Sequence, residues 1–523
     1  MTDSTHPSQN SESLWQQVKG FPGLFWTANW MELIERFSYY GLRTVVPIYM
    51  VLAFEEGGPQ FTHIEKASIF AYWALVQSFI PVFTGGFADR FGYKLNIVIA
   101  TFVKIAGYLV MGYAIRIAAV MNNGDLTGVE GNINGAAGGE YTYWVFFAGA
   151  MLLAAGTAIF KPGLQGMVAK IMPKSRASTG WGIFYQMVNV GAFLGPLLAG
   201  PLRLMSWEYV FLACAAAIAL NFIPLFFFSE PERSAEEQDN SGIMESLIKS
   251  FKGLFEPRLF AFTILFSGFW LMFFQLFDIL PNFIDDWVDS REIGAMLQGT
   301  FGGIVPINPD GNLGQEWMIN INALLISLLA FLMGYLTGKV KSLHAMILGI
   351  GVSCVAIWML GMSMDGWWCL FAIGVFSLGE MAASPTRLRY LANIAPPGRS
   401  GAYMGYANAT VGIGWFFGSL IAGNWYENGG DKVNLAKTYL VENLGQTQSA
   451  VDALKKTQVV DRLVELSPNL NDAWGAQKLL WDTYHPYEMW TYFALIGVSS
   501  MVGLMVFNYV TQKQDAAKAK ASS

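Results

Sequence analysis

The chain has 523 residues, of which 13% are charged and 54% are hydrophobic, and its formal net charge is −6. Soluble domains carry about 25% charged residues, and a dozen membrane spans would use roughly 240 apolar residues. This composition fits a polytopic helical membrane protein and excludes a soluble multidomain enzyme, a disordered chain and a fibrous protein. The negative balance lacks the basic excess of nucleic-acid-binding proteins, so we expect a lipid bilayer as partner and no nucleic acid.

Continuous apolar segments recur along the chain and predict an all-α polytopic membrane protein with twelve transmembrane helices. Continuous runs argue against a β-barrel, whose strands alternate between apolar and polar residues. The segments are 21–53, 67–88, 95–119, 143–169, 179–202, 207–228, 259–284, 317–338, 343–363, 367–393, 401–424 and 487–511.

The connections divide these helices into two halves of six. The predicted units are an N-tail (1–20), an N-terminal half (21–228), a linker (229–258), a C-terminal half (259–511) with an insertion (425–486), and a C-tail (512–523). The insertion has apolar residues at approximate helical spacing, so we expect short helices on the outer face. They would serve as a structural lid or, alternatively, as a partner or gating surface.

Lysine and arginine are unevenly distributed between the connecting loops. With the N-terminus placed inside, the short outside loops hold little beyond Lys66, Arg203 and Arg291. Cytoplasmic loops of membrane proteins carry an excess of these basic residues. We therefore expect both termini in the cytoplasm, and the compact loops without a cleaved signal indicate a bacterial inner membrane.

The first segment contains four ionisable residues, which are costly in a membrane and therefore indicate function. Glu32 and Arg36 are four residues apart and share a helix face, which Tyr40 continues. An arginine suits a substrate carboxylate, because its planar fork can bind both oxygens. A buried glutamate such as Glu32 or Glu35 suits a proton site, because burial and a nearby arginine shift its pKa in opposite directions. The alternative is a static salt-bridge cluster that holds helices together.

The end of the second segment has the form GGxxADRxxGxK. It resembles the loop signature of the major facilitator superfamily. Glycines there allow close helix packing, and the charged residues can pair with helix ends nearby. We expect a gating loop that holds one access state, formed by Gly85, Asp89, Arg90, Gly92 and Lys94.

A weaker copy of this loop follows the eighth segment, at residues 334–339. Its equivalent place in the second half indicates two halves related by an axis along the membrane normal, as in transporters that rock around a central site. The alternative is chance placement of glycines.

Four further motifs are spread over both halves. They are ELIERFSYYG at 32–41, GTAIFKP at 156–162, FYQMVNVGAF at 184–193 and GEMAASP at 379–385. Together they resemble signature stretches of the proton-dependent oligopeptide transporter (POT) family, a branch of the major facilitator superfamily. The resemblance implies the major facilitator fold.

The resemblance also implies roles for individual residues. Glu32 and Glu35 would couple the proton, together with Lys161. Arg36 and Lys161 would receive a peptide carboxylate, and Glu380 would face the peptide's amino group. Positive charge from one half and negative charge from the other would complement a zwitterion. Neighbouring substrate-binding residues by the same resemblance are Tyr40, Asn189, Asn322 and Ser384.

The seventh segment departs from the family pattern. Phe274 stands where family members usually carry an acidic residue, and Asp278 lies one helical turn further on. We hypothesise that Asp278 takes over part of the missing acid's role in proton coupling. The alternative is that Asp278 caps the outer end of the helix.

Smaller departures concern substrate more than mechanism. Gly163 replaces the family's usual asparagine, and Ala71 occupies the position of a histidine found in some animal relatives. His63 is expected to be a loop residue. Lys104 lies in the middle of the third segment outside any motif, where it would pair with an acid or extend toward the membrane surface.

We therefore predict a transporter, and no enzyme, that moves di- and tripeptides inward with protons by alternating access. It needs no metal and no other cofactor, because the proton gradient supplies the energy, and it would act as a monomer or weak oligomer. The alternatives are another cargo (an amino-acid conjugate, a nucleoside-like or sugar-like solute, or an anion such as nitrate) and a transporter-derived receptor.

Overall fold

The computed structural model describes residues 14–123, 134–173, 176–227, 253–395 and 400–522, and helices form most of it. Each of the twelve predicted segments contains one long helix. In the N-terminal half these are α2 (Gly23–Arg43), α4 (His63–Phe91), α5 (Tyr93–Gly112), α7 (Tyr141–Ile171), α8 (Ala177–Met205) and α9 (Trp207–Ala219). In the C-terminal half they are α12 (Pro257–Phe273), α17 (Ile321–Gly338), α18 (Ser342–Leu360), α19 (Gly366–Ile394), α20 (Ser400–Gly429) and α25 (Glu488–Ser522).

Within the described residues, nine helices are long and apolar enough to cross a membrane. The charge-rich α2 is outside this set, because it contains Glu32, Glu35, Arg36 and Arg43. The prediction of an all-α polytopic membrane protein is confirmed.

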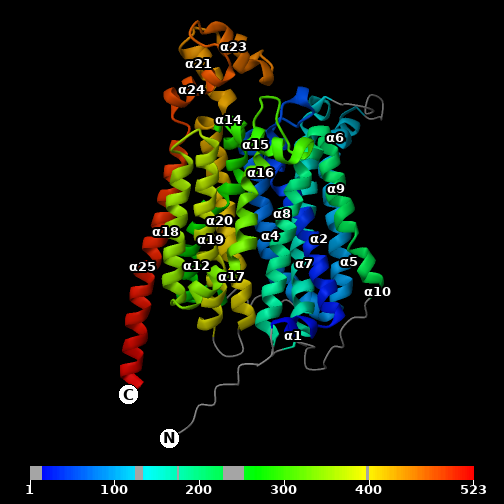
Figure 1. Cartoon of the computed structure of the whole chain (residues 1–523), viewed down its shortest axis with the longest axis vertical. Helices are drawn as coiled ribbons and strands as arrows, with labels where there is room; N and C mark the ends of the chain where they lie inside the picture. The colour runs from blue at the N-terminus through cyan, green and yellow to red at the C-terminus, as the bar shows by residue number, and fades with distance from the viewer. Residues whose placement is uncertain (1–13, 124–133, 174–175, 228–252, 396–399, 523) are drawn as a thin grey trace.

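The two halves stand side by side, with α2, α5, α7 and α9 in one and α12, α18, α19 and α25 in the other (Figure 1). Across the boundary, α4 packs against α20 and α8 packs against α17. The linker between the halves lies outside the described residues, apart from 253–258, and so do residues 1–13 of the N-tail. The short helix α1 (Leu14–Lys19) follows, where the sequence indicated only a tail.

Several predicted continuous segments are interrupted. The seventh contains α12, α13 (Gln275–Asp278) and α14 (Leu280–Trp287), and the first ends in α3 (Val46–Val51). Pro47 and Pro281 lie in the first turns of α3 and α14. Proline has no backbone N–H to donate and is tolerated at a helix start, so these residues favour a new helix over a continued one.

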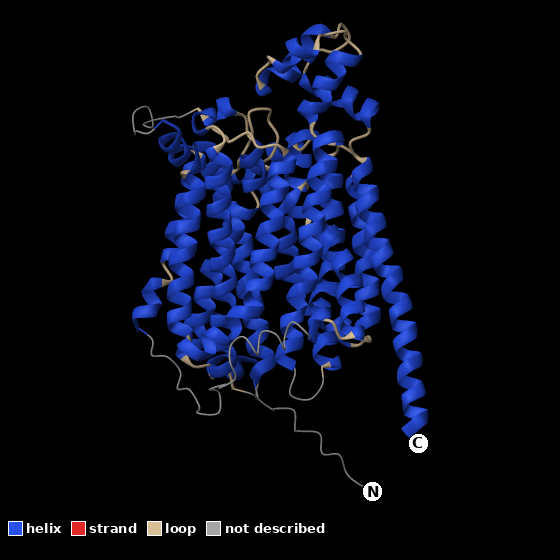
Figure 2. Ribbon diagram, turned by 180° about the vertical axis from the view of Figure 1, so that it is seen from behind, coloured by secondary structure: helices blue, strands red, loops and turns tan. Residues whose placement is uncertain are grey.

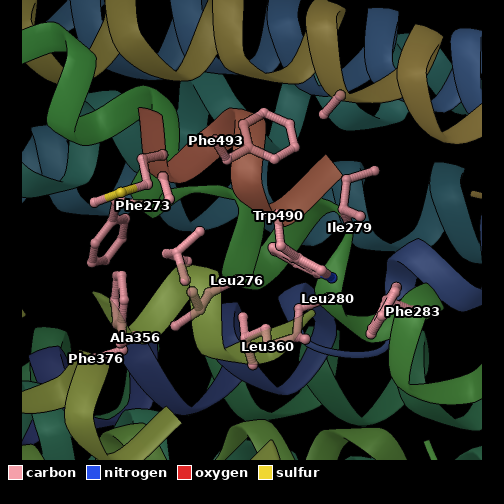
Figure 3. Close-up of a cluster of buried hydrophobic side chains, with 14 of the residues drawn as sticks. Phe273, Leu276, Ile279, Leu280, Phe283, Ala356, Leu360, Phe376, Trp490 and Phe493 are labelled. Carbon is pink, nitrogen blue, oxygen red and sulfur yellow. The ribbon is translucent and has the colours of Figure 1, made fainter. Parts of the chain in front are cut away.

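A broad apolar core fills the C-terminal half around the interrupted seventh segment. Phe283 lies beside Trp490 of α25, and Phe273 lies beside Phe376 of α19 (Figure 3). Large buried aromatic side chains contribute strongly to packing. This core fixes the position of α13, whose last residue is Asp278.

The insertion folds into short helices, as predicted. They are α21 (Lys432–Glu442), α22 (Gln448–Asp452), α23 (Val459–Leu466) and α24 (Ala473–Tyr484). They stand at one end of the bundle, here called the insertion end, whereas α1 and the end of α25 lie at the opposite end (Figures 1 and 2). The predicted C-tail continues α25 as helix as far as Ser522.

Candidate functional site

The charged residues of α2 form one buried cluster. Arg36 bonds to Glu35, and its Nε lies 3.4 Å from Oε1 of Glu32, as expected for residues four apart. The Arg36 guanidinium also lies 5.0 Å from the centre of the Tyr39 ring and 5.9 Å from that of Tyr40. Ion pairs and cation–π contacts within α2 therefore both hold the Arg36 side chain in place.

Lys104 of α5 completes this cluster. Its Nζ bonds to Oε1 of Glu35, and both side chains are fully buried. The expected pairing with an acid is thus observed, and the alternative of a lysine extended toward the membrane surface is wrong.

Lys161 of α7 lies within electrostatic range of the same cluster, which includes Glu32, Glu35 and Arg36. Its side chain is half-buried. Among the residues that the structure describes, no ion pair involves its ammonium group. Lys161 therefore brings a positive charge to the N-terminal side of the site.

The C-terminal half contributes the opposite charge. Glu380 of α19 accepts a hydrogen bond of 2.9 Å from Nδ2 of Asn322, which also bonds to Ser377. Asn322, one of the predicted substrate-binding residues, thus lies beside the glutamate. Glu380 also lies within electrostatic range of Tyr40 and Tyr185, both from the N-terminal half.

The other predicted neighbours are placed less directly. Asn189 is buried on α8 and donates to the backbone oxygen of Tyr185 at 2.8 Å. Ser384 lies one helical turn beyond Glu380 on α19 and is half-buried. Asn189 shares α8 with Tyr185, and Ser384 shares α19 with Glu380. Within the described part of the chain, neither side chain bonds to the charged groups.

Asp278 lies at the junction between the halves. It bonds to Arg43 of α2 and accepts hydrogen bonds from Ser419 Oγ at 2.6 Å and Trp415 Nε1 at 3.1 Å. Its partners are side chains from α2 and α20, which favours the hypothesis of an acid in the charge network over a helix cap. Phe274 stacks on Trp415 at 4.3 Å and supports this arrangement.

Three more contacts join the halves at the insertion end. Lys66 Nζ bonds to Asn282 Oδ1 at 2.5 Å, and Arg203 Nε lies 3.0 Å from Glu316 Oε1. Lys456 of the insertion donates to a backbone oxygen of α3 at 2.6 Å. The two halves are therefore held together at this end.

His63 corrects a prediction. It is the first residue of α4, not a loop residue, and only 2% of it is exposed. Its Nε2 lies 2.9 Å from Asp431 Oδ2, and its backbone N–H donates to Glu427. This role could not be predicted from the sequence, because the partners of His63 lie more than 360 residues away along the chain.

The departure at Gly163 has a local explanation. A Cβ at this position would lie 3.2 Å from Nδ2 of Asn96 on α5. The space beside Gly163 is thus taken by an asparagine from the neighbouring helix.

The predicted gating loop is described only in part. The side chains of Gly85, Asp89 and Arg90 lie outside the described ones. Gly92 sits between α4 and α5 with a φ of +106°, a backbone region that favours glycine. Lys94 follows in the first turn of α5 and is half-buried.

Comparison with known proteins adds to this geometry. The family model of the Major Facilitator Superfamily matches residues 30–307 and 292–435. The multidrug resistance protein MdtH of Shigella dysenteriae is 23% identical over 360 residues, covering 67% of this chain and 74% of MdtH. A Na(+), Li(+), K(+)/H(+) antiporter of Planococcus maritimus is 22% identical over 361 residues, covering 64% of this chain and 74% of that protein.

Solved structures of POT transporters share the fold. A peptide transporter POT in complex with sulfate has a TM-score of 0.60 at 18% identity, covering 96% of this chain and 99% of that one. A POT family transporter in complex with 5-aminolevulinic acid has a TM-score of 0.62 at 16% identity, covering 94% of this chain and 97% of that one.

The chain is a membrane transporter by fold and belongs to the major facilitator superfamily. The fold shared with POT transporters agrees with the resemblance found in the sequence motifs.

Proposed function

We propose that this protein belongs to the POT branch and is a proton-coupled symporter that carries di- and tripeptides inward across a bacterial inner membrane. The observation that carries the proposal is the division of charge. Arg36 and Lys161 stand in one half and Glu380 in the other, with Tyr40 within electrostatic range of both Arg36 and Glu380. A zwitterion carries a carboxylate and an ammonium group in one small molecule, and these complement the positive and the negative side of the site.

The chemistry of binding follows from these side chains. The peptide carboxylate lies toward Arg36 and Lys161, because charge-assisted bonds to a guanidinium or ammonium are the stronger ones. The peptide amino group lies toward Glu380, which Asn322 orients through its 2.9 Å bond. Because the two ends of the ligand bind different halves, substrate binding favours their approach.

Proton coupling is assigned to the carboxylates of the network, Glu32 and Glu35 in α2 and Asp278 in α13. Protonating a carboxylate weakens its ion pair with arginine. Asp278 bonds to Arg43 across the boundary, so its protonation would ease separation of the halves at the insertion end. A proton drives uptake only if its binding favours states that also bind substrate.

Competition in liposomes tests the zwitterion requirement. Purified protein is reconstituted, and uptake of labelled di-alanine is competed with N-acetyl-di-alanine, which lacks the amine, and di-alanine amide, which lacks the carboxylate. We expect unlabelled di-alanine to compete at least tenfold better than either blocked form. Equal competition by the blocked forms, or none by di-alanine, would contradict the proposal.

A second candidate keeps the carrier and changes the cargo. One structure of this fold is a complex with 5-aminolevulinic acid, a small amino acid, and the sequence relatives include a cation/proton antiporter. A zwitterionic amino-acid derivative suits the charge division described above. A cation suits it less, because Arg36 and Lys161 would repel it. Adding 5-aminolevulinic acid, nitrate and Na⁺ to the competition separates these cargoes.

A further inference from the structure

Lys104 occupies an unusual place for a lysine. It lies in the middle of α5, is fully buried, and has its Nζ 5.8 Å from the ring centres of Tyr39 and Phe160. Gly156 of α7 faces it, and a Cβ at Gly156 would lie 3.0 Å from the backbone nitrogen of Lys104. The close approach of α5 and α7 therefore depends on this glycine.

The two carboxylates of α2 have different partners. Both oxygens of Glu35 are bonded to cations, Oε1 to Lys104 and Oε2 to Arg36. Glu32 has only the 3.4 Å contact from Arg36 to Oε1, and its buried Oε2 has no hydrogen-bond partner among the described residues. A proton on Glu35 would break two ion pairs, whereas a proton on Glu32 weakens one long contact.

We propose that Lys104 is a positioning residue that keeps Glu35 ionised, so that Glu32 is the carboxylate that accepts the coupling proton. This assignment rests on the proposed symport and deepens it. With two carboxylates and two cations, the cluster is neutral before protonation. The charge of Lys161 is then left uncompensated and available to a substrate carboxylate.

The surroundings of Glu32 agree with this division. Arg36 and Glu35 face it from its own helix, Lys104 from α5 and Lys161 from α7. Two further residues pack against the same stretch of α2. A Cβ added at Gly191 of α8 would lie beside Arg36, and Asn221 donates a hydrogen bond of 3.3 Å to the backbone of α2. Both are neutral, so the local field is set by the four charged neighbours.

This arrangement links proton and substrate. A proton on Glu32 adds one positive charge to a neutral cluster beside Lys161. The site then attracts a carboxylate more strongly, which is the coupling that symport requires. Release of the proton leaves Glu32 ionised, and the site then attracts the substrate carboxylate less strongly.

The test uses charge changes at the Lys104–Glu35 pair. Lys104→Gln removes the cation, so Glu35 competes for the proton, and we expect the pH midpoint of di-alanine uptake to rise by at least one unit. Lys104→Arg keeps the charge and should preserve the wild-type midpoint to within about 0.3 units. The double variant Lys104→Gln/Glu35→Gln removes the pair as a unit and should return the midpoint toward the wild-type value.

An unchanged midpoint in Lys104→Gln would overturn the assignment. So would a double variant whose midpoint stays as far shifted as that of the single variant. Where Lys104→Gln does not fold, a double variant whose midpoint differs from the wild-type value would also overturn the assignment. The midpoint is also measured without substrate, from the pH dependence of thermal unfolding of the purified protein. If the wild type does not transport di-alanine but the variants show these shifts in thermal unfolding, peptide symport is refuted while the role of Lys104 is supported.

Discussion

Glu32 is the residue at which proton and substrate are expected to meet, because it is the less strongly paired carboxylate of α2. Glu32→Gln carries a permanent neutral side chain and cannot release a proton. We expect gradient-driven accumulation of di-alanine to fall at least tenfold, while counterflow exchange without a gradient stays within about threefold of wild type. Parallel assays of accumulation and counterflow in the same liposomes check this, and equal losses in both would contradict the assignment.

Glu380 is the residue expected to recognise the peptide's amino group. Truncating one partner of a buried charge pair costs about 2–5 kcal/mol, which is roughly 30-fold or more in affinity. We therefore expect Glu380→Gln to raise the KM for di-alanine by about that factor and to affect N-acetyl-di-alanine little. Glu316→Gln is the control, because Glu316 is a buried glutamate that pairs with Arg203 at the insertion end. An equal effect of both variants would point to a structural role for Glu380.

At the scale of elements, the helix α13 carries the contact between the halves at Asp278. Asp278→Asn loses the ion pair with Arg43 while keeping an acceptor for Ser419. We expect the halves to separate more readily at the insertion end, and a cysteine placed at Asn282 to react faster with a water-soluble thiol reagent. The Arg43→Gln/Asp278→Asn double variant should react about as fast as the single one. If Asp278→Asn leaves the reaction rate of the cysteine at position 282 unchanged, the Arg43–Asp278 pair does not hold this end closed.

The short helix α14 carries a pH-dependent contact outside the membrane segments. Burial raises the pKa of Asp286 to about 6, although Lys432 lies 3.6 Å away and Tyr426 donates to the carboxylate. The folded protein thus binds this proton more tightly than the unfolded chain. The contribution to stability is fully present below the ordinary aspartate pKa of 3.8 and is lost as pH rises from there through about 6, at about 1.4 kcal/mol per pH unit.

We expect thermal unfolding to show this difference. Between pH 5 and pH 7.5 the wild type should lose stability relative to Asp286→Asn. Asp289→Asn is the control. The hydrogen bond from Arg291 lowers the pKa of Asp289, so this carboxyl group stays ionised between pH 5 and pH 7.5. Parallel pH profiles for wild type and Asp286→Asn would contradict the raised pKa.

The elements themselves were largely predictable, because spans and motifs are local properties of the sequence. The charge stripe of α2 and the glutamate of α19 followed from apolar runs interrupted by ionisable residues. The burial of His63 and the pairing of Lys104 with Glu35 did not follow. Each depends on a partner far along the chain, and one sequence contains no information on which distant residues meet.

At the scale of the whole molecule, the contacts described between the halves cluster at the insertion end. Arg43 meets Asp278, His63 meets Asp431, and the insertion itself reaches the N-terminal half through Lys456. Transport by alternating access requires all of these contacts to break and reform together. The insertion starts and ends in the C-terminal half, so it moves with that half.

The most direct test of proton-coupled peptide uptake is accumulation of labelled di-alanine in liposomes that contain the wild-type protein. An inward proton gradient should concentrate di-alanine inside at least tenfold, and a protonophore should abolish the accumulation. Equilibration without accumulation, or proton-driven movement of Na⁺ in place of di-alanine, would contradict it.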